Sequence, residues 1–165
     1  MYHKILWRVA SIAAMVLALS SQGRADGPAH RLAGTIDDYT AALDAAGPWE
    51  VSGKWSVALK GESGKGDVNL ALSMVRADSA TRSAHTHHVT LRNGEVTALA
   101  NGFRVSGPAL MSSNGNLAGF SGSTVTVDVT GGDAIPDSNI TITYAGAAAG
   151  HFGDQPLHGV VTGRW

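Results

Sequence analysis

Apolar and polar side chains alternate along most of the chain that follows residue 48. In the segment 49–60 the apolar members fall mainly on every second position, and the segment 68–74 repeats this spacing. Successive residues of a β-strand point to opposite faces, so a period of two is typical of a strand with one buried face. The sequence therefore predicts a mostly β domain built from such strands.

Glycine-rich and polar turns divide this region into about eight expected strands. These strands span residues 49–60, 68–74, 85–92, 95–100, 103–111, 125–129, 140–144 and 159–165. Asn93-Gly94 is typical of a type I′ hairpin turn and would place Arg92 opposite Glu95. The pattern predicts an all-β antiparallel barrel, with a β-sandwich as the alternative. A long first strand and a chain that ends inside a strand favour a closed barrel, in which the first and last strands pair.

One short helix is expected before the first of these strands. Thr35 and Asp38 have the spacing of a capping box, and apolar side chains follow at helical spacing until Gly47-Pro48 ends the pattern. These features predict a helix over residues 36–46. The expected organisation is a leader with this helix over residues 26–48, followed by a barrel or sandwich domain over residues 49–165.

The N-terminal segment has the three parts of a secretory signal peptide. Lys4 and Arg8 make the start basic, residues 12–19 are apolar, and Gly23-Arg24-Ala25 offers small residues before a cut at Asp26. The apolar run is about half of the roughly 20 residues that a membrane-spanning helix needs. We therefore expect residues 1–25 to be removed and the protein to be exported, periplasmic or extracellular, without a stable membrane anchor.

Composition narrows the possible chemistry. The chain has no cysteine, which excludes disulfides, thiolate metal ligands and lipid attachment through cysteine. Removing the three basic residues of the signal segment from the 12 in the chain leaves nine, against 13 acidic residues. A mildly acidic domain lacks the basic surface that a nucleic-acid partner needs, so none is expected.

A histidine cluster is the strongest candidate site. His85 and His87 share the strand face of Val89 and Leu91, which is the apolar one, whereas His88 faces outward. Two imidazoles on one face can bind the same ion. A third ligand from His151 or His158, or an oxygen of Asp154 or Glu95, would complete a site for Zn²⁺ or Cu²⁺. Such a site predicts metal binding or metal-assisted catalysis.

Two other functions remain open from the residues alone. The first is a metal-free barrel that binds a small molecule, lined by Trp49, Trp55 and aliphatic side chains, with His88 and Glu95 as further polar contacts. The second is a structural or interaction module. No G-x-S-x-G motif occurs, so the sequence does not decide whether the protein is an enzyme.

Two partial family resemblances accompany this pattern. Gly47-Pro48-Trp49 before a long strand resembles the G-x-W start of lipocalin-like barrels, which would imply a calyx for a small apolar ligand. His85-Thr86-His87 together with the C-terminal run from His151 to Trp165 resembles secreted CHRD-type β domains. The sequence as a whole also resembles those of uncharacterised secreted proteins.

Overall fold

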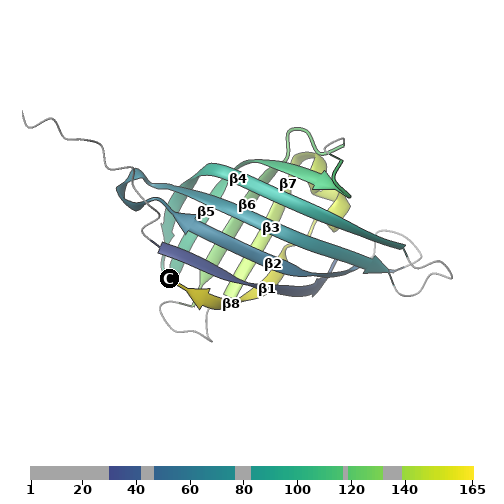
Figure 1. Ribbon diagram of the computed structural model, residues 1–165, viewed down its shortest axis with the longest axis horizontal. Coiled ribbons are helices and arrows are strands. Elements are labelled where there is room, and N and C mark those ends of the chain that lie inside the picture. The colour runs from purple at the N-terminus through teal and green to yellow at the C-terminus, as the bar shows by residue number, and fades with distance from the viewer. Residues whose placement is uncertain (1–29, 42–46, 77–82, 117–118, 132–138) are drawn as a thin grey trace, which may run out of the picture.

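Eight antiparallel strands form a closed barrel in the computed structural model (Figure 1). The structure describes residues 30–41, 47–76, 83–116, 119–131 and 139–165. The strands are β1 (His30–Tyr39), β2 (Glu50–Leu59), β3 (Lys65–Arg76), β4 (Ser83–Leu99), β5 (Gly102–Ser113), β6 (Thr124–Thr130), β7 (Asn139–Ala145) and β8 (Leu157–Arg164). Three short 3₁₀ segments accompany them: η1 (Gly61–Ser63), η2 (Gly146–Ala148) and η3 (Gly150–Phe152). Within the described part of the chain, no helix is long and apolar enough to cross a membrane.

Pairing of the first and last strands closes the barrel. Each strand is bonded to its sequence neighbours, and β1 pairs with both β2 and β8, as Figure 1 shows along the lower edge of the view. Closure gives every described strand a neighbour on both sides, so the sheet has no free edge strand. The prediction of a closed antiparallel barrel of about eight strands is therefore confirmed.

The expected helix over residues 36–46 is wrong where the structure describes it. Residues 36–39 belong to β1, whose burial alternates with a period of two, and residues 42–46 lie outside the described ranges. Tyr39 is 55% exposed and so does not form a buried helical stripe with Ile36. Pairing with β2 and β8 satisfies the backbone on both sides of this segment, which outweighs its local helical pattern. The barrel thus begins at His30 rather than at Trp49.

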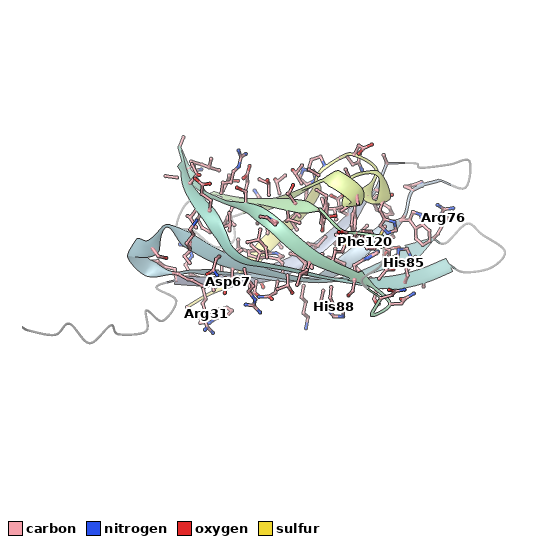
Figure 2. All side chains as sticks on the ribbon, turned by 90° about the horizontal axis from the view of Figure 1, so that it is seen from above. Arg31, Asp67, Arg76, His85, His88 and Phe120 are labelled. Carbon is pink, nitrogen blue, oxygen red and sulfur yellow. The ribbon has the colours of Figure 1, made fainter. Side chains whose placement is uncertain are left out.

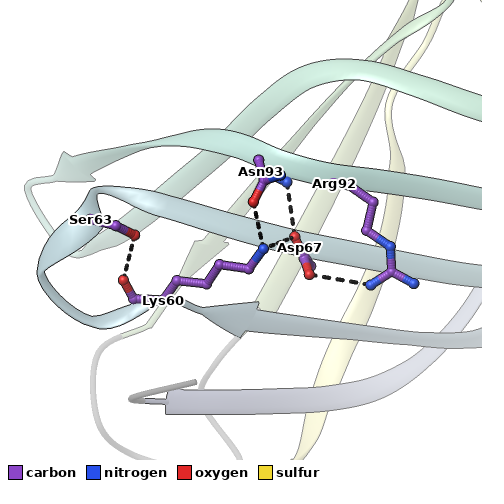
Figure 3. A network of polar contacts seen from close by, with 5 residues as sticks. All are labelled: Lys60, Ser63, Asp67, Arg92 and Asn93. Atoms are coloured by element: carbon purple, nitrogen blue, oxygen red, sulfur yellow. Dashed lines mark hydrogen bonds and ion pairs between the residues drawn. The ribbon is translucent and has the colours of Figure 1, made fainter. Parts of the chain in front are cut away.

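The Asn93-Gly94 hairpin is also wrong, because β4 continues through these residues as one bent strand. The register shifts there against both β3 and β5, which marks a β-bulge, and the connection to β5 is made instead at residues 100–101. Asn93 has a φ of 54°, and its N–H donates to Asp67 Oδ1 at 2.8 Å. Asp67 also binds Lys60 and Arg92, so one carboxylate holds the bulge (Figure 3).

Inward side chains fill the barrel interior. They are aliphatic on every strand, and β3 alone contributes Val68, Leu70, Leu72 and Met74, each at most 3% exposed. Burying a side chain of this size stabilises the fold by about 1.5–3 kcal/mol. The interior is therefore a packed core.

Candidate metal centre

Strand alternation turns His85 and His87 inward near one end of the barrel, as expected. His87 is fully buried and lies opposite Leu72 of β3, and His85 is half-buried and lies opposite Met74. His88 is exposed and points away from the interior, which Figure 2 shows by contrast with His85. The alternation of side chains along the strand therefore places His85 and His87 inside the barrel and His88 outside it.

The third member of the cluster is His151, in η3. Its Nε2 lies 3.1 Å from Nε2 of His85 and 2.9 Å from Nε2 of His87. One ring nitrogen from each of the three residues lies within 4.8 Å of the others. Tetrahedral ligands at about 2.0–2.1 Å from Zn²⁺ lie about 3.3–3.4 Å from one another, so separations of a few tenths of an ångström more would accommodate the ion.

A backbone carbonyl sets the tautomer of His87. Its Nδ1 lies 3.1 Å from the carbonyl oxygen of Ser112, which can only accept a hydrogen bond. Nδ1 is therefore the protonated nitrogen, and Nε2 offers its lone pair to the cluster. Metal-binding histidines are commonly oriented by such a bond from the other ring nitrogen.

The cluster favours neutral imidazoles. Burial, followed by repulsion from His151 and His85, lowers the pKa of His87 from 6.5 to about 4. Burial also lowers the pKa of His85, and burial together with repulsion from His85 lowers that of His151. All three rings are consequently deprotonated at neutral pH, the form that binds a metal.

Aromatic rings surround the histidines. Trp49 meets His85 edge-on at 4.8 Å between ring centroids, and Phe120 and Phe152 each contact both His87 and His151 at 5.3–5.6 Å. Figure 2 labels Phe120 and His85 toward the same end of the barrel. These rings exclude water from part of the cluster, and no carboxylate belongs to the group of close donors that the described residues form.

The remaining metal-ligand candidates lie elsewhere. His158 is exposed on β8, where its Nδ1 lies 3.0 Å from Asp38 Oδ2. Asp154 is exposed after η3, and Glu95 is exposed in the far half of β4, opposite Lys65. The structure brings none of these three side chains into the histidine group.

The two candidate ligand-binding tryptophans differ in their surroundings. Trp55 is 2% exposed in the core, and its Nε1 donates to the carbonyl oxygen of Val160 at 3.2 Å. Trp49 is half-buried beside His85, and the guanidinium of Arg76 lies 4.5 Å from the centroid of its ring. Trp49 therefore belongs to the surroundings of the histidines, and Trp55 belongs to the packed interior.

Sequence reasoning missed the carbonyl of Ser112 and the rings of Phe120 and Phe152. Ser112 and Phe120 fall in the segment 112–122, which the composition of glycine, serine and asparagine predicts to be an exposed loop. In the structure β5 extends to Ser113, which brings the Ser112 carbonyl beside His87. No local pattern marks a carbonyl as a partner of a distant ring, although Phe120 is an isolated aromatic residue in a polar segment.

Comparison of the chain with protein-family models, curated proteins and solved structures finds no match. The lipocalin-like and CHRD-type resemblances gain no family support from these comparisons. The function is therefore argued from the histidine group itself.

Proposed function

We propose that this protein is an exported β-barrel that binds one transition-metal ion, zinc or copper, through His85, His87 and His151. The observation that carries the proposal is the convergence of three Nε2 atoms from a strand and a distant 3₁₀ segment. Export rests on the signal-peptide pattern of residues 1–25. Imidazole nitrogen suits both zinc and copper.

Without a metal, hydrogen bonds cannot connect all three Nε2 atoms of the histidine group at once. A neutral Nε2 carries either one hydrogen or one lone pair in the plane of the ring. Because His87 Nε2 has a lone pair, His151 Nε2 must donate to it for the 2.9 Å contact to be a hydrogen bond. His151 then has no lone pair for His85, 3.1 Å away. A metal ion among the three nitrogens would accept all three lone pairs.

The donor set favours binding over hydrolysis as the primary role. Three protein ligands leave at least one coordination position for a further ligand, which is the arrangement of catalytic as well as binding sites. A metal-assisted hydrolase also needs a group that moves protons, commonly a carboxylate. The close donors here are histidines alone among the residues described, and metal binding is the function that they support directly.

Metal stoichiometry in tag-free protein tests the proposal. We expect one equivalent of Zn²⁺ or copper by elemental analysis after reconstitution and desalting. His87→Ala should lose this metal, whereas His88→Ala and His158→Ala should keep it, because those two rings lie outside the group. Less than about a tenth of an equivalent in the wild type, or equal loss in the His88 variant, would overturn the proposal.

A pocket at the opposite end of the barrel supports a second candidate function, the binding of a small amphipathic anion. The pocket has a volume of about 490 Å³, within the usual range for small-molecule sites. Leu32, Leu59 and Phe103 line it with apolar surface. His30 and Arg164 are its ionisable lining residues, and a guanidinium can bind a carboxylate through two hydrogen bonds.

Competition between decanoate and decanol for a fluorescent probe tests this second function. Decanoate should displace 8-anilinonaphthalene-1-sulfonate from the wild-type protein at several-fold lower concentration than decanol. Arg164→Gln should remove that difference. Arg104→Gln should preserve it, because Arg104 is exposed and binds Asp128 through two hydrogen bonds of 2.7 Å. Equal displacement by the acid and the alcohol would contradict an anion-selective site.

A further inference from the structure

We infer that the ion held by the histidine group is Cu(I), with the thioether of Met74 as its fourth donor. This inference rests on the proposed metal-binding function and names the metal and its oxidation state. Two independent features support it, the charge of the donor set and the position of the buried methionines.

The first feature is the absence of negative charge from the group of close donors. Its three members are histidines, whose imidazole rings are uncharged when they bind a metal, and their neighbours are the rings of Trp49, Phe120 and Phe152. The cost of moving an ion out of water rises with the square of its charge, so a monovalent ion loses much less than a divalent ion in such surroundings. A donor set without negative charge in partly dry surroundings therefore penalises Cu(I) less than Zn²⁺ or Cu²⁺.

The second feature is a soft donor beside His85. Met74 of β3 is the direct cross-strand partner of His85, and it is inward and fully buried. Directly opposed residues of antiparallel strands have Cβ atoms about 4.5–5.5 Å apart. The flexible and polarisable side chain of methionine adapts to its surroundings, and thioether ligands select Cu(I).

Met111 provides a matched comparison. Met74 and Met111 are the two methionines that follow the expected signal peptide, and both are inward and at most 2% exposed. Met111 of β5 pairs with Val89, whereas His87 pairs with Ser113, two positions further along β5. Met111 thus shares the chemistry and burial of Met74 without lying directly opposite a histidine of the group.

Competition with bicinchoninate under anaerobic reducing conditions tests the inference on tag-free protein. The wild type should bind one Cu(I), and Met74→Leu should weaken Cu(I) at least tenfold while changing the Zn²⁺ affinity less than threefold. Met111→Leu should leave both affinities unchanged. Leucine is close to methionine in volume, so either variant should keep the fold, which circular dichroism checks.

X-ray absorption of the Cu(I)-loaded wild type gives a second measurement that needs no variant. We expect a sulfur scatterer in addition to nitrogen in the first coordination shell. Nitrogen alone, or equal Cu(I) affinities of the two methionine variants, would overturn the role of Met74. Tighter retention of Zn²⁺ than of Cu(I) would overturn the choice of metal, whereas failure to bind either ion would overturn the proposed function itself.

Discussion

Burial of a neutral His87 should make the metal-free protein lose stability in mild acid. The pKa of this ring falls from 6.5 in the unfolded chain to about 4 in the folded protein, because burial and the neighbouring histidines oppose its charge. Between these values the unfolded chain binds more protons. The contribution of the neutral His87 ring to the free energy of unfolding is therefore fully present above pH 6.5. It is lost as the pH falls toward 4.

The magnitude follows from the two pKa values. Between pH 7.5 and pH 5.0 the unfolded chain takes up a proton at His87 that the folded protein does not. This difference lowers the free energy of unfolding by about 2 kcal/mol. A domain of this size has a total stability of about 5–15 kcal/mol, so the loss is measurable. Burial lowers the pKa of His85 and of His151 as well, and these shifts act in the same direction.

Urea unfolding of the metal-free protein at pH 7.5 and pH 5.0 measures this loss, with a chelator present throughout. His87→Gln removes the ring but keeps a donor for the Ser112 carbonyl. We expect the variant to lose about 2 kcal/mol less than the wild type over this range. His88→Gln, which changes an exposed ring on the same strand, should follow the wild type. Parallel pH dependence in the wild type and the His87 variant would refute the reasoning.

Three further predictions concern the metal, the tryptophan and the bulge. Metal at 100 times its dissociation constant should raise the free energy of unfolding by about 2.7 kcal/mol, and a chelator should reverse the rise in melting temperature. Copper loading should quench tryptophan emission, and Trp49→Phe should remove most of that response, because Trp49 contacts His85. Gly94→Ala should destabilise the protein by about 1–3 kcal/mol in urea unfolding, since an added Cβ would lie 2.3 Å from a methyl carbon of the fully buried Leu91 and 3.0 Å from the carbonyl oxygen of Ser106. A Cβ added at Gly150 would have no atom within 4 Å, so Gly150→Ala should leave the free energy of unfolding nearly unchanged.

Two errors of strand assignment offset each other in the sequence analysis. The sequence predicts two strands, 85–92 and 95–100, where the structure has the single strand β4, and it predicts a helix where part of β1 lies, so the total of eight is unchanged. Asn93-Gly94 carries the chemistry of a turn in either case, because a type I′ turn and this bulge both place Asn93 at a positive φ. Simultaneous pairing of β4 with β3 and β5 decides between them, and this information is not local.

Strand alternation predicts the part of the candidate site that lies on regular strands. Parity placed His85 and His87 inward and His88 outward, and the same rule applied to β8 separates the outward His158 from the buried Leu157. His151 lies in a 3₁₀ segment, where no period of two applies. Its approach to His87 depends on barrel closure, which brings the chain after β7 over the end of β4. That contact joins residues 64 positions apart, so local spacing in the sequence cannot predict it.

The fold gives the three histidines unequal freedom, and this inequality bears on how the site would accept an ion. His87 lies where β4 pairs with both β3 and β5, and its ring is held by the Ser112 carbonyl, whereas His85 pairs with Met74 of β3. His151 lies in a three-residue segment that is fixed mainly by turn hydrogen bonds to Ala149 and by the packing of Phe152 on Tyr144, whose rings stack at 4.2 Å. The two N···N distances that involve His151, 3.1 Å and 2.9 Å, are a few tenths of an ångström shorter than in a tetrahedral zinc site, so a shift of His151 alone would adjust both. Two donors fixed by the barrel and one adjustable donor limit the entropy lost on binding, while allowing the site to adapt its geometry to the ion.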